Sequence, residues 1–342
     1  MGAPFFIVGA SRSGTTMMRL LLNAHSKIGV PKEMAYFEQC AIAGAIDTWQ
    51  SPQFKRGTYE DFVRGFLKKK HVALEGLDIE KLTADILGAG ATSLDIPIRK
   101  ALDAWAEKEG KDIWGEKTPK NLFYVDYIHA IMPDARFIYI VRDPRAVVNS
   151  MNRFARFVDD SVLNAFNWLQ AAEYGYKLLQ RSVPAEKRLE IKYENLVSDV
   201  EGTARQICAF LEEPFEEEML AFYTKSGSDL HPNANELGGT TTLTKPITTV
   251  SVEKWRNQLA ARDITLVETV CADAMKVHGY ESVGEKPGMS ERLEVRAKLK
   301  YCNWQQERNK HLRSYQLAFK PFEKTLHRIK NLFGSQKSKA KG

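Results

Sequence analysis

Apolar residues along this chain fall into two patterns: short unbroken runs, and stretches in which apolar positions lie three or four apart. The runs predict buried strands, because a strand that is covered on both faces has no polar side. They lie at 4–8, 28–31, 113–115 and 136–141, and a fifth strand is predicted at 189–193, where apolar and charged residues alternate. The second pattern predicts helices, at 58–70, 79–87, 98–107, 120–131, 161–181, 199–211 and 263–278. Strands that alternate with helices indicate an α/β fold, here a P-loop-type parallel β-sheet flanked by helices.

Two stretches stand outside this alternation. Residues 40–112 carry three predicted helices with no strand between them, so we expect a helical insertion there. Residues 291–342 hold 14 Lys and Arg but only 4 Asp and Glu, a net charge of +10 in a chain whose total is +6. We therefore expect a domain at 1–285, which includes the insertion, and a basic helical C-terminal extension at 286–342. Because the first 290 residues carry a net charge of −4, we expect no nucleic-acid partner.

A glycine-rich loop follows the first predicted strand. Gly9 and Gly14 allow tight turns that point successive backbone N–H groups inward, and the next helix adds the positive end of its dipole. The Gly-x4-Gly spacing is that of a P-loop, but Thr15 stands where a nucleoside triphosphatase has lysine, and the cation of this loop is Arg12. The residues expected to surround a phosphate are Gly9, Ser11, Arg12, Ser13, Gly14, Thr15 and Thr16.

Two further polar groups follow predicted strands, at the strand ends where ligands of a parallel sheet bind. The first is the run 116–119, which contains Lys117, and the second is Arg142, with Ser150 eight residues later. Arg142 can hold an anion through its bidentate fork. Two separate phosphate-binding groups suggest a nucleotide that carries phosphate at both ends of its sugar.

Four segments, in this order, resemble the motifs of sulfotransferases. Residues 6–16 are similar to the 5′-phosphosulfate loop of the family, and residues 140–150 are similar to its 3′-phosphate motif. Two further family segments resemble residues 192–196, and Lys245-Pro246 together with 253–255. The resemblance is nearest to the branch that contains tyrosylprotein sulfotransferases and bacterial sulfotransferases.

This resemblance implies a PAPS-dependent O-sulfotransferase, which moves a sulfuryl group from 3′-phosphoadenosine 5′-phosphosulfate (PAPS) to a hydroxyl-bearing acceptor and releases PAP. Arg12 and Lys117 would stabilise the charge that develops between phosphate and sulfate, while Arg142 and Ser150 would bind the 3′-phosphate. The residues that stand where relatives contact the nucleotide are Tyr193, Thr240 and Lys254. No metal is expected, because lysine and arginine meet the charge that Mg²⁺ meets in kinases.

A hydroxyl acceptor loses its proton as it attacks, so a base within hydrogen-bond reach is required. The resemblance assigns this role to Glu33, although Lys32 stands where the branch usually has an acidic residue; His129 is the alternative base. The insertion at 40–112 is the expected acceptor-binding segment, for a carbohydrate, a glycolipid, a small alcohol or a tyrosyl group. Two other functions stay open at this point: a P-loop kinase of a small molecule, and a non-catalytic nucleotide-binding protein.

The extension contains one amphipathic segment, in which Phe322, Leu326, Ile329 and Phe333 form an apolar stripe. Such a helix either makes a peripheral contact with an anionic membrane through 321–333, or packs on the domain or on the second subunit of a homodimer. The sequence has no run of eighteen apolar residues, no signal-peptide pattern and no paired cysteines. We therefore expect a cytoplasmic protein, at most peripheral at a membrane.

Overall fold

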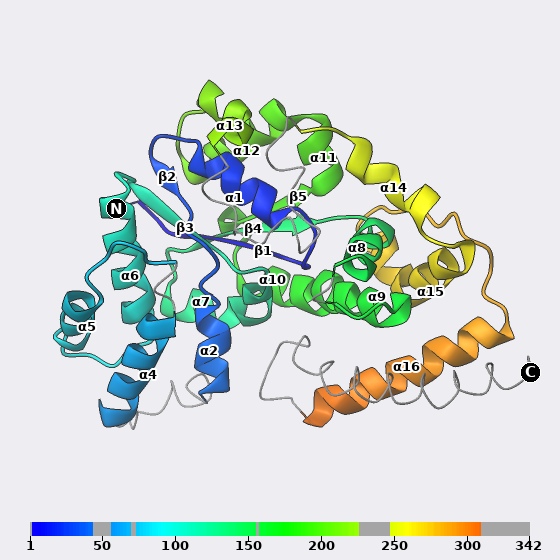
Figure 1. Cartoon of the computed structure of the whole chain (residues 1–342), viewed down its shortest axis with the longest axis horizontal. Helices are drawn as coiled ribbons and strands as arrows, with labels where there is room; N and C mark the ends of the chain where they lie inside the picture. The colour runs from blue at the N-terminus through cyan, green and yellow to red at the C-terminus, as the bar shows by residue number, and fades with distance from the viewer. Residues whose placement is uncertain (1, 44–55, 70–72, 155–156, 226–246, 309–342) are drawn as a thin grey trace, which may run out of the picture.

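The computed structural model of the chain describes residues 2–43, 56–69, 73–154, 157–225 and 247–308. A parallel five-stranded sheet lies at its centre, in the order β2-β3-β1-β4-β5 (Figure 1). The strands are β1 (Phe5–Gly9), β2 (Ile28–Gly29), β3 (Ile113–Lys117), β4 (Arg136–Val141) and β5 (Arg188–Lys192). The predicted α/β fold, a parallel sheet flanked by helices, is confirmed.

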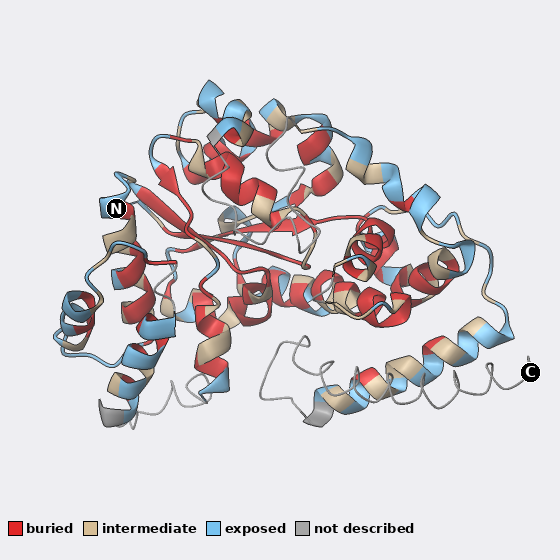
Figure 2. Ribbon diagram, viewed as in Figure 1, coloured by how far each residue is buried: buried red, intermediate tan, exposed pale blue. Residues whose placement is uncertain are grey.

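Alternate side chains of β1 enter two hydrophobic cores, one on each face of the sheet. Buried residues lie in the strands and in the helices above and below them (Figure 2). Phe5 and Ile7 belong to the core on the upper face, and Phe6 and Val8 to the core on the lower face. The upper face is covered by α1 (Thr15–Asn23), α11 (Tyr193–Ser198), α12 (Val200–Leu211), η4 (Glu217–Ala221) and α13 (Phe222–Lys225). The lower face is covered by α7 (Val125–Ile131), α8 (Pro144–Asn152), α9 (Ser161–Leu169), α10 (Tyr176–Ser182) and α15 (Ala261–Val277).

The predicted insertion packs beside the β3 end of the sheet, at the lower left of Figure 1. Its helices, together with the one that precedes it, are α2 (Tyr36–Ile42), α4 (Arg56–Lys69), α5 (Ile79–Leu87) and α6 (Asp95–Lys108). The Tyr36 ring lies 4.8 Å from that of Phe66 between centroids, and the Tyr36 hydroxyl donates to the Leu94 carbonyl at 2.7 Å. The insertion is therefore joined to α2, which begins three residues after Glu33.

Several elements differ from the sequence prediction. The helix expected at 120–131 begins as a 3₁₀ turn, η1 (Pro119–Tyr124), before α7, and the helix expected at 161–181 contains a π-helical segment, η2 (Gln170–Gly175). A further 3₁₀ turn, η3 (Ala185–Lys187), precedes β5. The sequence did not predict α2 or α11, which have only 7 and 6 residues and so show less than two full turns of helical periodicity.

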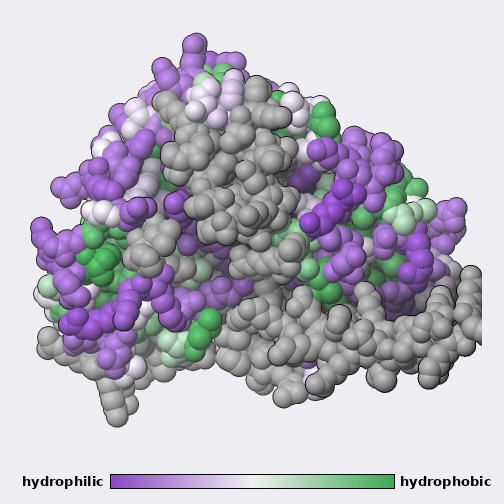
Figure 3. All heavy atoms as spheres, in the orientation of Figure 1, coloured by the Kyte–Doolittle hydropathy of each residue, from purple (hydrophilic) through white to green (hydrophobic). Residues whose placement is uncertain are grey.

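Two helices complete the described chain, α14 (Val250–Gln258) and α16 (Met289–Arg308). Leu299 and Cys302 of α16 pack with Leu163 and Phe166 of α9. The first helix of the predicted extension is thus docked on the domain, whereas the segment 321–333 lies outside the described residues. No helix in the described part of the chain combines the length and apolar character needed to cross a bilayer. Most of the described surface seen in Figure 3 is hydrophilic.

Candidate functional site

The loop after β1 forms a tight cradle that only glycine permits at two positions. A Cβ on Gly9, whose φ is 152°, would lie 2.3 Å from the carbonyl oxygen of Ile140. A Cβ on Gly14, whose φ is 97°, would lie 2.4 Å from the ring of Tyr193. Gly14 is also the N-cap of α1, so the free N–H groups of that helix open toward the loop. The backbone geometry expected of a phosphate cradle is present.

Two buried polar atoms at the cradle fit a ligand that accepts hydrogen bonds. Ser13 Oγ and Arg142 Nε are buried, and neither has a hydrogen-bond partner among the residues that the structure describes. A buried polar group left without a partner costs about 1–3 kcal/mol, so such atoms usually have one. Phosphate oxygens would supply acceptors to both atoms.

Arg142, at the end of β4, is held by contacts that leave its Nε unused. Its Nη1 donates to the Arg12 carbonyl at 3.1 Å, and its Nη2 donates to the Ser251 carbonyl at 2.8 Å. The guanidinium carbon lies 4.1 Å from the ring centroid of Tyr193, whose hydroxyl is 2.7 Å from Ser251 Oγ. The structure thus brings the predicted residues Arg142 and Tyr193 together, with Ser251 as an anchor that the sequence analysis missed.

Arg12 belongs to the same cluster of positive charge. Its Nε donates to Ser150 Oγ at 3.0 Å, and its guanidinium carbon lies 4.5 Å from the ring centroid of Phe154. Burial and, after it, the positive charge of Arg142 lower the pKa of Arg12. Two guanidinium groups that repel each other in a partly desolvated site fit a ligand of high negative charge.

Lys117 and Glu33 form a second group, at the end of β3. Lys117 Nζ donates to Glu33 Oε2 at 3.0 Å; the lysine side chain is only 9% exposed, whereas that of Glu33 is 45% exposed. The register of the sheet sets Lys117 beside Ile7 of β1, two residues before the cradle begins. The three predicted catalytic residues therefore fall into two groups: Arg12, which binds the predicted 3′-phosphate residue Ser150, and Lys117 with Glu33.

Glu116, which the sequence analysis gave no role, is fully buried beneath the loop that carries Glu33. Its Oε1 accepts hydrogen bonds from the Met34 N–H at 3.1 Å and from Thr118 Oγ1 at 2.5 Å, and its Oε2 accepts one from Asn121 Nδ2. Burial raises the pKa of Glu116 to about 7, and the hydrogen bonds from Thr118 and Met34 oppose that rise. The sequence contained one indication of this role: side chains alternate along a strand, so Glu116 and Thr118 should face one side and Lys117 the other.

A buried ionic network supports the end of β4. The carboxylate of Glu194 accepts the Asp143 N–H at 2.9 Å, and Arg145 donates to Asp143 at 2.6 Å and to Glu268 at 2.7 Å. The Arg145 guanidinium also lies 4.1 Å from the ring centroid of Trp255 in α14. This network joins α8, α14 and α15 behind Arg142, which explains why polar residues follow both β4 and β5.

Other predicted residues are not part of the cluster. Lys254 is exposed on α14, while Thr240 and Lys245 lie outside the described residues. His129, the alternative base, lies in the last turn of α7, where burial and the charge of Lys187 lower its pKa. Since Lys187 immediately precedes β5, His129 lies toward the amino edge of the sheet, whereas Glu33 pairs with the carboxyl end of β3.

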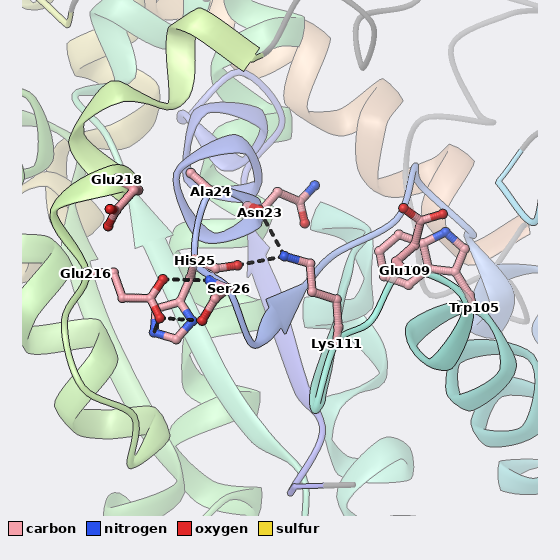
Figure 4. Close-up of a pocket in the computed structure, with 9 residues that line it drawn as sticks. All are labelled: Asn23, Ala24, His25, Ser26, Trp105, Glu109, Lys111, Glu216 and Glu218. Atoms are coloured by element: carbon pink, nitrogen blue, oxygen red, sulfur yellow. Dashed lines mark hydrogen bonds and ion pairs between the residues drawn. The ribbon is translucent and has the colours of Figure 1, made fainter.

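A pocket of about 690 Å³ lies at the other end of α1 from the cradle (Figure 4). Its polar groups bind one another: Lys111 Nζ donates to the His25 carbonyl at 2.6 Å, and the Ser26 N–H donates to Glu216 at 2.6 Å. Lys111 Nζ also donates at 3.3 Å to the carbonyl of Asn23, the last residue of α1. These contacts indicate a structural joint between α1 and the segment before η4.

Several known proteins resemble this chain over most of its length. A model described as the sulfotransferase family matches residues 4–217. Protein-tyrosine sulfotransferase A of Caenorhabditis elegans is 24% identical over 302 residues, which are 86% of this chain and 72% of that protein. Protein-tyrosine sulfotransferase 1 of Danio rerio is 26% identical over 290 residues, or 82% of this chain and 73% of that protein.

Solved structures show the same fold. The sulfotransferase domain of the Synechococcus PCC 7002 olefin synthase has a TM-score of 0.55 at 22% identity, covering 82% of this chain and 96% of that one. The sulfotransferase domain from the curacin biosynthetic pathway has a TM-score of 0.54 at 17% identity, covering 83% and 99%. The predicted resemblance to the tyrosylprotein and bacterial sulfotransferases is confirmed. Because the family model spans more than half of the chain, including β1, the cradle, β3 and β4, the chain belongs to the sulfotransferase family and is an O-sulfotransferase with the family's donor, PAPS.

Proposed function

We propose that this enzyme transfers the sulfuryl group to a hydroxyl acceptor with Glu33 as the general base. The contact between Lys117 and Glu33 is the observation that carries the proposal, since it joins a cation and a carboxylate at the carboxyl end of β3, a strand that pairs with β1. The lysine is nearly buried and the carboxylate is half exposed, so the carboxylate is open to an incoming hydroxyl group. A base must reach the proton that it removes, and this position satisfies that requirement.

The donor nucleotide would lie along the carboxyl ends of β1 and β4. The N–H groups of the cradle and Ser13 Oγ would bind its 5′-phosphate, and Arg142 Nε with Ser150 would bind its 3′-phosphate. When bound, PAPS supplies a sulfuryl group on a good leaving group. The chain supplies positive charge from Arg12, Lys117 and Arg142, a role that a metal ion plays in phosphoryl transfer; the proposal therefore includes no metal.

Glu33 and Lys117 act together in this scheme. Glu33 accepts the proton of the acceptor hydroxyl as that oxygen attacks, and Lys117, 3.0 Å away, stabilises the carboxylate before this transfer. Lys117 is then free to donate toward the oxygen on which negative charge develops. The acceptor is a tyrosyl group, a carbohydrate, a glycolipid or a small alcohol. A tyrosyl peptide is the first to assay, because the names of both curated relatives contain protein-tyrosine sulfotransferase.

The test is the substitution Glu33→Gln, which keeps the shape of the side chain and removes its basicity. We expect kcat to fall on the order of 10²–10⁴-fold, while the Kd for PAP measured by calorimetry stays within about twofold, because a base touches the acceptor.

Glu38→Gln is the matched control, since Glu38 also pairs with a lysine, Lys120, and lies five residues further along the chain. Near-normal turnover in Glu33→Gln would overturn the base assignment. Binding of ATP in preference to PAP by the unmodified enzyme would instead contradict the donor and support the kinase alternative.

A further inference from the structure

We propose that Glu116 is a positioning residue that holds Glu33 in place by binding the backbone directly after it. The proposal rests on the assignment of Glu33 as the base. Glu116 would touch neither donor nor acceptor, since it is fully buried and its contacts are with the loop, Thr118 and Asn121.

The loop is held from one side by two hydrogen bonds to its backbone. Met34 N–H donates to Glu116 Oε1 at 3.1 Å, and Ala35 N–H donates to Thr118 Oγ1 at 2.9 Å. Thr118 Oγ1 in turn donates to the same Glu116 oxygen at 2.5 Å. The two amides that follow Glu33 are therefore both fixed, one directly by the carboxylate and the other through Thr118.

The loop needs such support because its backbone is strained. Ala35 has a φ of 51°, in the left-handed region that a residue with a Cβ rarely adopts. A conformation of this kind persists where surrounding contacts impose it. The bond from Ala35 N–H to Thr118 and the neighbouring bond to Glu116 supply those contacts.

The same short strand end also contacts the base itself. Side chains alternate along a strand, so Glu116 and Thr118 face the loop backbone while Lys117, between them, pairs with the Glu33 carboxylate. Residues 116–118 thus fix both the backbone and the side chain of the catalytic loop. A misplacement of about 1 Å can cost on the order of 10²-fold in rate.

The hydrogen bonds of Glu116 predict different effects for the variants Glu116→Gln and Glu116→Ala. All three side-chain and backbone groups that reach Glu116 donate to it, and Asn121 Oδ1 has no partner in the part of the chain that the structure describes. In Glu116→Gln the new amide can donate to Asn121 if the Asn121 amide turns over, and Oε1 still accepts from Met34. Glu116→Ala removes every contact. We therefore expect Gln to rescue what Ala loses.

The experiment measures kcat, the Kd for PAP and the hydrogen-exchange rates of the Met34 and Ala35 amides. We expect Glu116→Ala to lower kcat on the order of 10²-fold, to speed exchange of the Met34 amide at least about tenfold, and to leave PAP affinity within about twofold. Glu116→Gln should stay within about threefold of the unmodified enzyme in each measurement. Thr118→Val, which keeps the shape and removes the hydroxyl, should speed exchange of Ala35 and gives a second test if Glu116→Ala does not fold.

A double-variant cycle separates positioning from general destabilisation. In the Glu33→Gln background, Glu116→Ala should lower the remaining rate no further, since a residue that acts through Glu33 has nothing left to position. Additive losses in the cycle, or faster exchange with unchanged kcat, would overturn the proposal. An unchanged exchange rate of the Met34 amide in Glu116→Ala would also overturn the proposal, whatever the value of kcat. Full activity in the single variant Glu33→Gln would show that Glu33 is not the base. Glu116 would then have no catalytic residue to position.

Discussion

At the scale of single residues, the nucleotide site consists of side chains that orient one another. Arg142 uses both Nη atoms on backbone carbonyls and rests on the ring of Tyr193, which leaves its Nε without a partner among the described residues. A lysine has no planar fork and could not make these contacts together. The arginine is thus oriented before any ligand binds, which reduces the entropy lost on binding.

The ring of Tyr193 is the contact in this arrangement that substitution can test most cleanly. Tyr193→Leu removes the ring beneath the guanidinium, so we expect the Kd for PAP to rise about tenfold, within the usual worth of a cation–π contact. Tyr193→Phe keeps the ring and loses only the hydroxyl contact to Ser251, so its Kd should stay within about threefold. Calorimetry with PAP measures both, and equal affinity in the Leu variant and the unmodified enzyme would show that Tyr193 does not orient Arg142.

At the scale of elements, the sequence predicted the sheet and the cradle better than the contacts around them. The apolar runs at 4–8 and 136–141 could be recognised as strands, because β1 and β4 are buried on both faces and so carry few polar residues. The cradle could be predicted from Gly9 and Gly14, because the backbone geometry at these positions excludes residues with a Cβ.

The roles of Glu116 and Glu194 could not be predicted in the same way. Glu116 binds an amide 82 residues away, and Glu194 binds one 51 residues away. Local patterns carry no information on such pairs, which exist only after the strands have assembled. The motifs showed which residues surround the ligand, and the fold shows which residues hold them there.

A second element-scale feature is the joint between β5 and the end of α15. His278 lies 2.9 Å from the Ala172 carbonyl and 3.3 Å from Glu190, which also accepts the Tyr176 hydroxyl at 2.8 Å. Burial opposes the ionised form of Glu190, but the hydrogen bonds from His278 and Tyr176 outweigh it and lower the pKa of Glu190.

A carboxyl group whose pKa is lower in the folded state stabilises the fold above its unfolded pKa, near 4.3 for Glu. That contribution is lost as the pH falls through the folded value. Glu190→Gln should therefore lower Tm at pH 7, and the difference should shrink below about pH 4. Glu173→Gln, in an exposed pair with Lys177, is the control and should leave Tm unchanged at every pH. A Tm difference for Glu190→Gln that is independent of pH would contradict this account.

At the scale of the whole molecule, α16 is part of the folded body. Val295 and Cys302 are buried against it, and Lys298 Nζ binds Asp160 at 2.6 Å. The basic extension expected from 286 onward therefore does not begin as a free tail, because its first helix covers part of α9.

Two shortened chains test this docking. A chain that ends at Gly288 exposes Leu163 and Phe166, because it loses their contacts with Leu299 and Cys302 of α16. Full burial of one Leu or Phe side chain is worth about 1.5–3 kcal/mol. We expect its Tm to fall by about 5–10 °C, with the Kd for PAP within about twofold. A chain that ends at Arg308 keeps α16 and should match the full chain in both. Equal Tm for the two shortened chains would show that α16 adds no stability.

The closeness of Arg12 to Arg142 has a consequence for the lifetime of the enzyme. Burial and, after it, the charge of Arg142 lower the pKa of Arg12, so the two charged guanidinium groups oppose the folded state at neutral pH. A nucleotide that neutralises them stabilises the fold, by about 2.7 kcal/mol at a concentration one hundred times its Kd. Proteases act on opened chains, and their rate follows the open population. The amount of enzyme that survives in a cell should therefore rise and fall with the supply of activated sulfate, so that the donor sets the abundance of the catalyst as well as its rate.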